Sequence, residues 1–526
     1  MSSNESLAQS SFRSASSLMG LQLFSRLFTF VLNQAMVRIA PPQAYGIAAI
    51  QFELLLSTIL FLSREGVRNT LLRAKTMGPA MRNMSVLPVL LGFPVALVTA
   101  YAYAHFAGSE VRAQQYFDVS IGMYALAALF ELMSEPMHNL AMAELMTGIR
   151  VRAEGLGITS KTVVTFLVLV YDMRSGGEGA LALIAFAGGQ LVYGATVLGT
   201  YLAAYGSSNK PSHFFDPGLL RLSMTMTSQS LIKHFLTEGD KLILSYFSPL
   251  QDQGGYAVAV NYGSLIARIV FQPIEEAYRG FFSKVLGNVT TNIGSKTEND
   301  VALQQASTAL ISLLSVQAAF SLILIVFGTA YLPFLLQILL PRQYLATSAP
   351  QVLSAWVWYI PVLAFNGGLE AFLSSVATPQ DLNKQSRWMA IFSVVYTVAA
   401  VSFFNLRLGD ASLVYANILN LSVRIAYTGT FITSFFARCG ARQLLDWRAA
   451  VPKTQVLFCV AVSAIQILGS ALFLRVEASG PEEGFTRGVL LHIGIGMLLG
   501  AANLLTWWRY SGRYMSLPKA DRPKTQ

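Results

Sequence analysis

The sequence predicts an all-α, polytopic membrane protein with about fourteen transmembrane helices, and three observations support this prediction. Hydrophobic residues make up 54% of the 526 residues and charged residues only 12%, about half the charged share of a typical soluble domain. The mean hydropathy is +0.51. Apolar stretches long enough to cross roughly 30 Å of hydrocarbon recur along the chain, with polar breaks between them. A soluble protein would need polar surface that this sequence lacks, so lipid must solvate much of the chain.

Each of fourteen stretches fits a membrane-crossing helix. Strands are excluded because lipid cannot satisfy an open sheet edge, and because the stretches are far longer than the roughly ten residues of a barrel strand. The predicted spans are residues 15–38, 43–63, 85–106, 117–138, 156–173, 180–205, 217–248, 255–280, 303–332, 347–377, 387–405, 410–436, 454–475 and 487–508.

Lysine and arginine are distributed unevenly between the two sides of the predicted membrane. Fourteen spans place both termini on one side, which carries 23 of these residues against 6 on the other. Cytosolic loops hold such an excess, so we predict that both termini are cytosolic. The net charge of +10 follows from this asymmetry, and no basic fold is present that would suggest a nucleic-acid partner.

Motifs of known enzyme classes are missing from the sequence. There is no Walker loop, no H-E-x-x-H and no paired C-x-x-C, and the five histidines are scattered far apart. We therefore expect no catalytic residue, metal ligand or cofactor, and a protein that is not an enzyme. Transport, lipid handling and scaffolding remain.

Charged residues inside the predicted spans are the main candidates for function. A charge near the bilayer centre costs at least about 3 kcal/mol, so each needs a function, an ion-pair partner or a route to the headgroups. Pairing, or reaching to a lipid headgroup, is the favoured interpretation for Glu131, Lys161 and Arg424. The positions are Arg26, Glu53, Glu131, Lys161, Lys233, Asp240, Lys241, Arg268, Glu275, Glu370 and Arg424.

A positive stripe is predicted at the end of the second span, in FLSREGVRNTLLRAK. Glu53, Arg64, Arg68 and Lys75 fall within about 60° of one another if the span continues as one helix. Arg64 and Arg68 repel each other, and Glu65 offsets this only partly. The face invites an anion at the cytosolic membrane edge, although an anchor that follows the positive-inside rule explains it equally well.

A polar stripe also runs through the eighth span, in NYGSLIARIVFQPIEEAYRGFFSK. Lipid will not face such a stripe, and Pro273 is expected to interrupt the helix where protein or a cavity can satisfy the freed carbonyl. The residues that share this face are Asn261, Arg268, Gln272, Glu275 and Arg279.

The second and eighth spans look like copies. The pattern Glu65-x-x-Arg68 recurs as Glu276-x-x-Arg279, 211 residues later, and the same offset lays the first span on the seventh. This predicts two pseudo-symmetric six-helix lobes, residues 1–206 and 207–440, followed by residues 441–526 with two more helices and a cytosolic tail. A G-x-x-x-G pattern, Gly496 to Gly500, predicts close packing of the last helix.

Three stretches resemble the signature regions of the Rft family: SRLFTFVLNQAMVR, FLSREGVRNTLLRAK and ARIVFQPIEEAYRGFF. That family consists of endoplasmic-reticulum proteins implicated in moving the dolichyl-diphosphate-linked oligosaccharide used in protein N-glycosylation. It belongs to the superfamily of multidrug, oligosaccharidyl-lipid and polysaccharide exporters, which have two lobes around a central cavity. The resemblance implies an endoplasmic-reticulum membrane location, this glycolipid and membrane lipids as partners, and alternating access through a basic central cavity.

The expected site follows from the chemistry of that lipid. Arginine binds diphosphate in a bidentate manner, carboxylates orient arginine, and amides bond sugars. Loss of Arg68 is expected to weaken function without unfolding the protein. We expect Arg26, Arg64, Arg68 and Arg268 to hold the diphosphate, Glu65, Glu275 and Glu276 to orient them, and Asn33, Asn261 and Gln272 to bond the glycan.

Two alternatives from other classes stay open at this point. The protein could be an accessory protein that binds the glycolipid without flipping it. It could also be a cation-coupled exporter of small molecules, which Glu53 and the superfamily kinship suggest. The sequence does not decide whether the protein flips the glycolipid or only binds it. It also leaves open the glycan, the energy source, the oligomeric state and any protein partner.

Overall fold

The structure is a computed structural model that describes residues 31–71, 79–144, 146–206, 217–291, 296–474 and 486–510. Helices account for nearly all of these residues, and none of them lies in a β-strand. The predicted all-α class is therefore confirmed. A helix bonds its own backbone groups, which is the property that a hydrocarbon solvent requires.

The chain divides into two compact units, Met1–Ala257 and Val258–Gln526. Residues 31–39 of the first unit are helical. The next elements of that unit are α2 (Pro42–Gly46), η1 (Ile47–Phe52), α3 (Glu53–Leu71), α4 (Pro79–Met84), α5 (Leu87–Phe106), α6 (Ser109–Arg112), α7 (Phe117–Met133), α8 (Glu135–Ala143), α9 (Thr147–Arg174), α10 (Ala182–Tyr205), α11 (Pro217–Thr237) and α12 (Gly239–Phe247).

Helix α13 (Leu250–Ile266) contains the boundary between the units. The later elements are η2 (Ala267–Phe271), α14 (Gln272–Thr291), α15 (Lys296–Leu339), α16 (Arg342–Leu345), α17 (Ala349–Val376), α18 (Pro379–Asn405), α19 (Ala411–Arg438), η3 (Arg442–Leu444), η4 (Trp447–Ala450), α20 (Thr454–Phe473) and α21 (Arg487–Tyr510).

Every predicted span overlaps a helix of the described residues. Eleven of the described helical stretches are long and apolar enough to cross a membrane, so the chain is a multi-pass membrane protein. The number fourteen stays a prediction, as does the division into residues 1–206, 207–440 and 441–526. The compact units divide later than residue 206 because α11 packs on α3 and α12 packs on η1.

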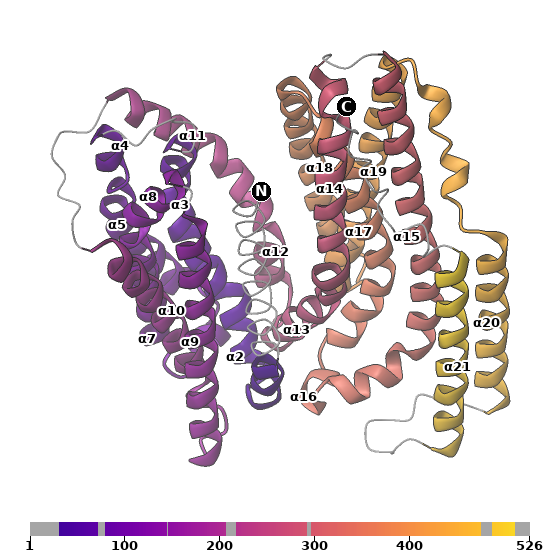
Figure 1. Cartoon of the computed structure of the whole chain (residues 1–526). Coiled ribbons are helices and arrows are strands. Elements are labelled where there is room, and N and C mark those ends of the chain that lie inside the picture. Colours follow the sequence, from indigo (N-terminus) through magenta and orange to yellow (C-terminus); the bar gives the residue numbers. More distant parts are fainter. Residues whose placement is uncertain are drawn as a thin grey trace, which may run out of the picture. The chain divides into compact units, whose positions relative to one another are not determined.

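The second unit repeats the helix packing of the first. In the first unit α3 packs on α5 and α7, α5 packs on α7, and α10 packs on α7 and α9. In the second unit α14 packs on α15 and α17, α15 packs on α17, and α19 packs on α17 and α18. The helices of each unit can be followed in Figure 1. The matching pairs show the pseudo-symmetry that the recurring Glu-x-x-Arg pattern predicts.

A π-helical turn interrupts two of the predicted spans, the second (residues 43–63) and the eighth (residues 255–280). The first turn is η1 and the second is η2, which lies directly before Pro273. The expected interruption near Pro273 is therefore confirmed, whereas η1 has no proline in the turn that follows it. Such turns are frequent at functional sites because they leave backbone groups that a regular helix would bond.

Aromatic residues fill the core of each unit. In the first unit Phe52 is fully buried and its ring lies 4.9 Å from that of Tyr124. In the second unit Phe372 is fully buried and its ring lies 5.1 Å from Phe282 and 5.8 Å from Phe436. These clusters hold the helices that carry the charged residues described below.

The two C-terminal helices pack on each other and on α15 (Figure 1). A Cβ atom at Gly496 would lie 2.3 Å from the ring of Tyr331, so α21 approaches α15 as closely as the glycine pattern predicts. His492 and Asn503 are buried on α21 and contact Ser470 and Ser463 of α20, at 2.8 and 2.6 Å. These polar contacts fix α20 against α21.

Helices α2 and α13 approach each other at backbone distance. A Cβ atom at Gly254 would lie 2.1 Å from the carbonyl oxygen of Pro42, and one at Gly46 would lie 2.6 Å from the nitrogen of Gly254. Beside this contact, Gln51 Nε2 donates to Gln253 Oε1 at 2.8 Å, and the Tyr103 hydroxyl donates to Gln51 at 2.6 Å. Only glycine fits at Gly254, because the neighbouring atom belongs to the backbone and cannot rotate away.

We predict that Gly254→Ala lowers the thermal unfolding midpoint of the purified protein, because forcing a methyl group into this contact costs about 1–3 kcal/mol. The control is Gly199→Ala on α10, where a Cβ atom meets nothing within 4 Å. Alanine favours a helix interior by about 1 kcal/mol over glycine, so the control should unfold no earlier than the unchanged protein. Equal midpoints for the two variants would contradict the close contact of α2 with α13.

Candidate functional site

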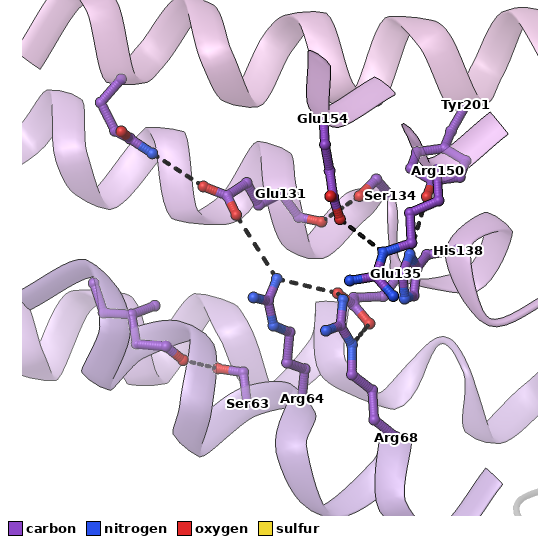
Figure 2. A network of polar contacts seen from close by, with 12 residues as sticks. Ser63, Arg64, Arg68, Glu131, Ser134, Glu135, His138, Arg150, Glu154 and Tyr201 are labelled. Atoms are coloured by element: carbon purple, nitrogen blue, oxygen red, sulfur yellow. Dashed lines mark hydrogen bonds and ion pairs between the residues drawn. The ribbon is translucent and has the colours of Figure 1, made fainter. Parts of the chain in front are cut away.

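Two arginines of α3 converge on one buried carboxylate in the first unit (Figure 2). Arg68 donates from Nε and Nη2 to the two oxygens of Glu135, at 2.8 and 2.5 Å. Arg64 donates from Nη1 to Glu135 at 3.2 Å, and the same nitrogen lies 3.7 Å from Glu131. Glu135 is fully buried, and Arg64 and Arg68 keep 22% and 27% of their side chains exposed.

The spacing of these residues explains why they meet. Arg64 and Arg68 are four residues apart on α3, so their side chains lie on one face. Glu131 and Glu135 are also four residues apart, at the end of α7 and the start of α8. Helix α3 packs on both α7 and α8, and the two pairs therefore face each other with opposite charge. Two cations and two carboxylates balance, which lowers the cost of keeping either pair out of water.

The network continues deeper into the unit through a glutamine. Gln190 on α10 donates from Nε2 to Glu131 at 3.1 Å, and its Oε1 accepts from Lys161 of α9 at 2.5 Å. Glu131 and Gln190 are buried, at 8% and 3% exposure. The expected pairing is confirmed for Glu131, which lies 3.7 Å from Arg64, whereas Lys161 bonds Gln190 and forms no ion pair among the described residues. The same interpretation holds for Arg424 on α19, which pairs with Glu370 on α17.

More exposed contacts surround this network. His138 Nδ1 lies 3.0 Å from the Tyr201 hydroxyl, and Arg150 pairs with Glu154 at 2.8 Å along α9. Both members of the second pair are nearly half exposed. The Arg150–Glu154 pair therefore offers an exposed counterpart to the buried arginine pair.

The stripe of the second unit is arranged differently. Arg268 donates from Nη2 to the carbonyl and side-chain oxygens of Asn261, at 3.1 and 3.0 Å. Among the described residues no carboxylate lies within 4.0 Å of this exposed guanidinium. Arg279 pairs with Glu275 one turn earlier, at 2.6 Å. The turn η2 lies between these two halves, so the span is not the single regular helix on which the predicted common face was based.

The remaining predicted residues are placed as follows. Asn33 is half-buried in the helical residues 31–39, and Gln272 and Glu276 are exposed on α14. Glu65 lies beside Arg64 on α3, three residues before Arg68. Arg26 lies outside the described residues. The structure thus brings Arg64, Arg68 and Glu65 together in the first unit, and Arg268 and Asn261 together in the second.

The sequence analysis missed Glu135. It lies inside the predicted span of residues 117–138 but is not among the charged residues singled out there. A usable signal was present, because Glu131 and Glu135 have the same four-residue spacing as Arg64 and Arg68. Matching the spacing of opposite charges on two neighbouring spans would have identified the pair.

The fold and the buried charges define a class: a polytopic membrane protein built from two repeated helical units, as transporters and flippases are. Among solved structures, the chain is similar to "Lipid II flippase MurJ, inward closed conformation", with a TM-score of 0.60, 11% identity, and coverage of 92% of this chain and 98% of that one. It also resembles an inward-facing multidrug resistance MATE family transporter of the MOP superfamily, with a TM-score of 0.50, 11% identity, and coverage of 77% and 94%. These likenesses concern the fold.

The chain belongs to the Rft protein family, whose model matches residues 10–516. It is 34% identical over 493 residues to the Yarrowia lipolytica Man(5)GlcNAc(2)-PP-dolichol translocation protein RFT1, covering 82% of this chain and 71% of that protein. Identity to the protein of the same name is 30% in Saccharomyces cerevisiae (82% and 84% covered) and 28% in Mus musculus (95% and 94%). The suspected family is thereby confirmed, and the relatives are translocation proteins rather than enzymes.

We predict that Glu135→Ala lowers the stability of the folded protein strongly. The change leaves Arg68 without its partner in a buried site, and removing one member of a buried pair typically costs about 3–5 kcal/mol. The measurement is the thermal unfolding midpoint of detergent-purified protein. Glu154→Ala is the control, since exposed pairs contribute about 0–1 kcal/mol. Indistinguishable midpoints for the two variants would mean that Glu135 is not held as described.

Proposed function

We propose that the protein moves a dolichyl-diphosphate-linked oligosaccharide from the cytosolic to the lumenal leaflet of the endoplasmic-reticulum membrane, as a precursor for protein N-glycosylation. The names of the related proteins support the substrate, and the likeness to flippases and exporters supports the class of activity. The observation in this chain that carries the proposal is the convergence of Arg64 and Arg68 at the end of a membrane span.

The arginine pair has the right chemistry for a diphosphate. A guanidinium has five N–H donors, of which Arg68 uses those on Nε and Nη2 and Arg64 uses Nη1 in the described contacts. The remaining donors belong to side chains that are about one quarter exposed. Glu135, which is buried behind them, acts as a positioning residue: it fixes the two guanidinium groups so that a second anion can bind their exposed edges.

The second unit contributes a cation of a different kind. Arg268 is exposed and hydrogen-bonded only to Asn261 among the described residues, so an incoming phosphate need not displace a carboxylate from it. Asn261 orients this arginine, which extends its expected role of bonding the glycan. We propose that Arg268, like Arg64 and Arg68, binds phosphate of this lipid, and that Glu275, Glu276 and Gln272 contribute polar side chains on the second unit. The proposed path alternates its access between the two sides of the membrane and uses no nucleotide.

Our first expectation is that a neutral pair of substitutions, Arg68→Gln with Glu135→Gln, reduces binding of a purified dolichyl-diphosphate oligosaccharide roughly tenfold to a hundredfold. Both charges are removed together because Arg68→Gln alone would leave Glu135 with fewer partners and could destabilise the protein. The matched control is Arg150→Gln with Glu154→Gln, which removes an exposed pair. If both double variants bind as tightly as the unchanged protein while folded, the arginine pair is structural and the diphosphate site is wrong.

A second expectation concerns Arg268→Gln, which should weaken binding of the same lipid by a comparable factor without lowering the unfolding midpoint. The reason is that Arg268 has no carboxylate partner among the described residues, so its loss leaves no buried charge. Arg387→Gln on α18, also exposed, controls for a general loss of positive charge. Equal weakening in both variants would indicate non-specific attraction of the anionic lipid.

Transbilayer movement is separated from binding by reconstitution. The purified protein is placed in proteoliposomes whose two leaflets both contain the glycolipid, and a lectin or glycosidase is added outside. If the protein moves the lipid across the bilayer, the fraction of glycolipid bound or cleaved should rise with time above the fraction that started in the outer leaflet. Binding without such movement would favour the accessory-binder alternative. Movement of small cationic drugs driven by an ion gradient, with the tagged protein mainly at the plasma membrane, would favour the exporter alternative.

A further inference from the structure

A large cavity lies in the second unit, and none of the residues proposed above to bind the glycolipid is among the residues that line it. Its volume is about 830 Å³, and it is bounded by α15, α17, α19 and the segment from Arg442 to Ala450. Leu314, Phe365 and Leu369 form one side. The size is in the range of small-molecule sites, so the cavity can accept a ligand of substantial length.

The wall formed by α19 is apolar even though it carries hydroxyl groups. Thr430 donates to the carbonyl of Tyr427 at 2.7 Å, Thr433 to that of Gly429 at 2.9 Å, and Ser434 to that of Thr430 at 2.7 Å. Each hydroxyl is thus bonded to its own helix, and methyl and methylene groups line much of the cavity. A sugar would find few free hydrogen-bond partners here, whereas a hydrocarbon chain would find a matching surface.

The length of this wall matches one leaflet of a membrane. The lining residues of α19 run from Ile425 to Ala437, which is roughly 18 Å along the helix at 1.5 Å per residue. Half of a hydrocarbon core of about 30 Å is about 15 Å. A lipid chain that belongs to one leaflet fits this length, whereas a polyprenyl chain long enough to cross both leaflets would exceed it.

Positive charge lies at the end of the cavity. Arg442 is the charged member of the described lining, and no carboxylate of the described chain lies within ion-pairing distance of it. Trp447 beside it is 37% exposed, and tryptophan is enriched at the depth of lipid headgroups. Arg438 precedes this segment and Arg448 lies within it, against the single acidic residue Asp446.

We infer that this cavity binds an anionic phospholipid of the surrounding membrane, with one acyl chain along α19 and the phosphate at the guanidinium of Arg442. Trp447 lies at the headgroup level. The site uses none of the residues of the proposed glycolipid path, so a test of this site does not depend on the proposed function. Its occupant would pack against the residues of the buried core beneath it, which include Leu314 and Leu369.

Quenching of tryptophan fluorescence tests the site directly. The protein is reconstituted with phosphatidylserine or phosphatidylcholine that carries bromine atoms on one acyl chain, because bromine quenches a nearby indole. The difference between the unchanged protein and Trp447→Phe isolates the signal of Trp447 from that of the other five tryptophans. We expect Trp447 to be quenched at a lower mole fraction of brominated phosphatidylserine than of brominated phosphatidylcholine.

Two variants examine the headgroup contact and the chain contact separately. Arg442→Gln should reduce the preference for phosphatidylserine roughly fivefold, and Arg448→Gln, on the same segment but outside the lining, should preserve it. Gly429→Leu should abolish the quenching by either lipid, because it fills the cavity. A Cβ atom at Gly429 meets nothing within 4 Å, so this variant is expected to fold.

Three results would overturn the inference. The first is equal quenching by the two lipids in the unchanged protein, and the second is quenching that persists in folded Gly429→Leu. The third is displacement of brominated phosphatidylserine by a much smaller amount of dolichyl phosphate, which would assign the cavity to the polyprenyl lipid. In each case binding of the dolichyl-diphosphate oligosaccharide to Gly429→Leu, measured in parallel, shows whether the proposed function is affected.

Discussion

Hydrocarbon offers no hydrogen bonds and no counter-ions, and the rest of this structure depends on that constraint. Each charge inside a span must be balanced by a group of the protein, because the solvent cannot balance it. In the first unit the constraint joins four helices, since Lys161 reaches Glu131 through Gln190 and Glu131 lies beside Arg64. In the second unit it joins α17 to α19 through Glu370 and Arg424. The charged contacts therefore help to determine which helices pack against each other.

The two units share a packing scheme but differ in how they compensate their charges. Arg68 of the first unit bonds a carboxylate on another helix, whereas the matching Arg279 of the second unit bonds Glu275 on its own helix. One consequence is that α3 is tied to α8 by charge, while α14 has no such tie among its described contacts. Arg268, in the same predicted span, bonds the oxygens of Asn261 and no carboxylate of the described residues. Equivalent helices of the repeated fold thus compensate their arginines in two different ways.

Hydroxyl side chains meet the same constraint by donating hydrogen bonds to carbonyl groups of their own helix. Thr433 and Ser434 bond carbonyl groups one turn earlier on α19, as Thr165 does on α9 and Thr329 does on α15. A polar residue bonded in this way presents carbon rather than oxygen to its surroundings. This is why a helix whose sequence contains many hydroxyl groups can line an apolar cavity, and why sequence polarity alone misjudges the chemistry of such a wall.

The sequence by itself determined the all-α class, the stretches that become helices and most of the charged residues that need an explanation. These follow from local composition and from the thickness of a bilayer, neither of which depends on what each helix packs against. The tertiary structure alone decided the partners: that Glu135 binds both arginines of α3, that Gln190 connects Lys161 to Glu131, and that Arg268 bonds Asn261. Partners depend on which helices are neighbours and on the face that each presents. A π-helical turn such as η1 shifts that face, and the sequence analysis did not predict it.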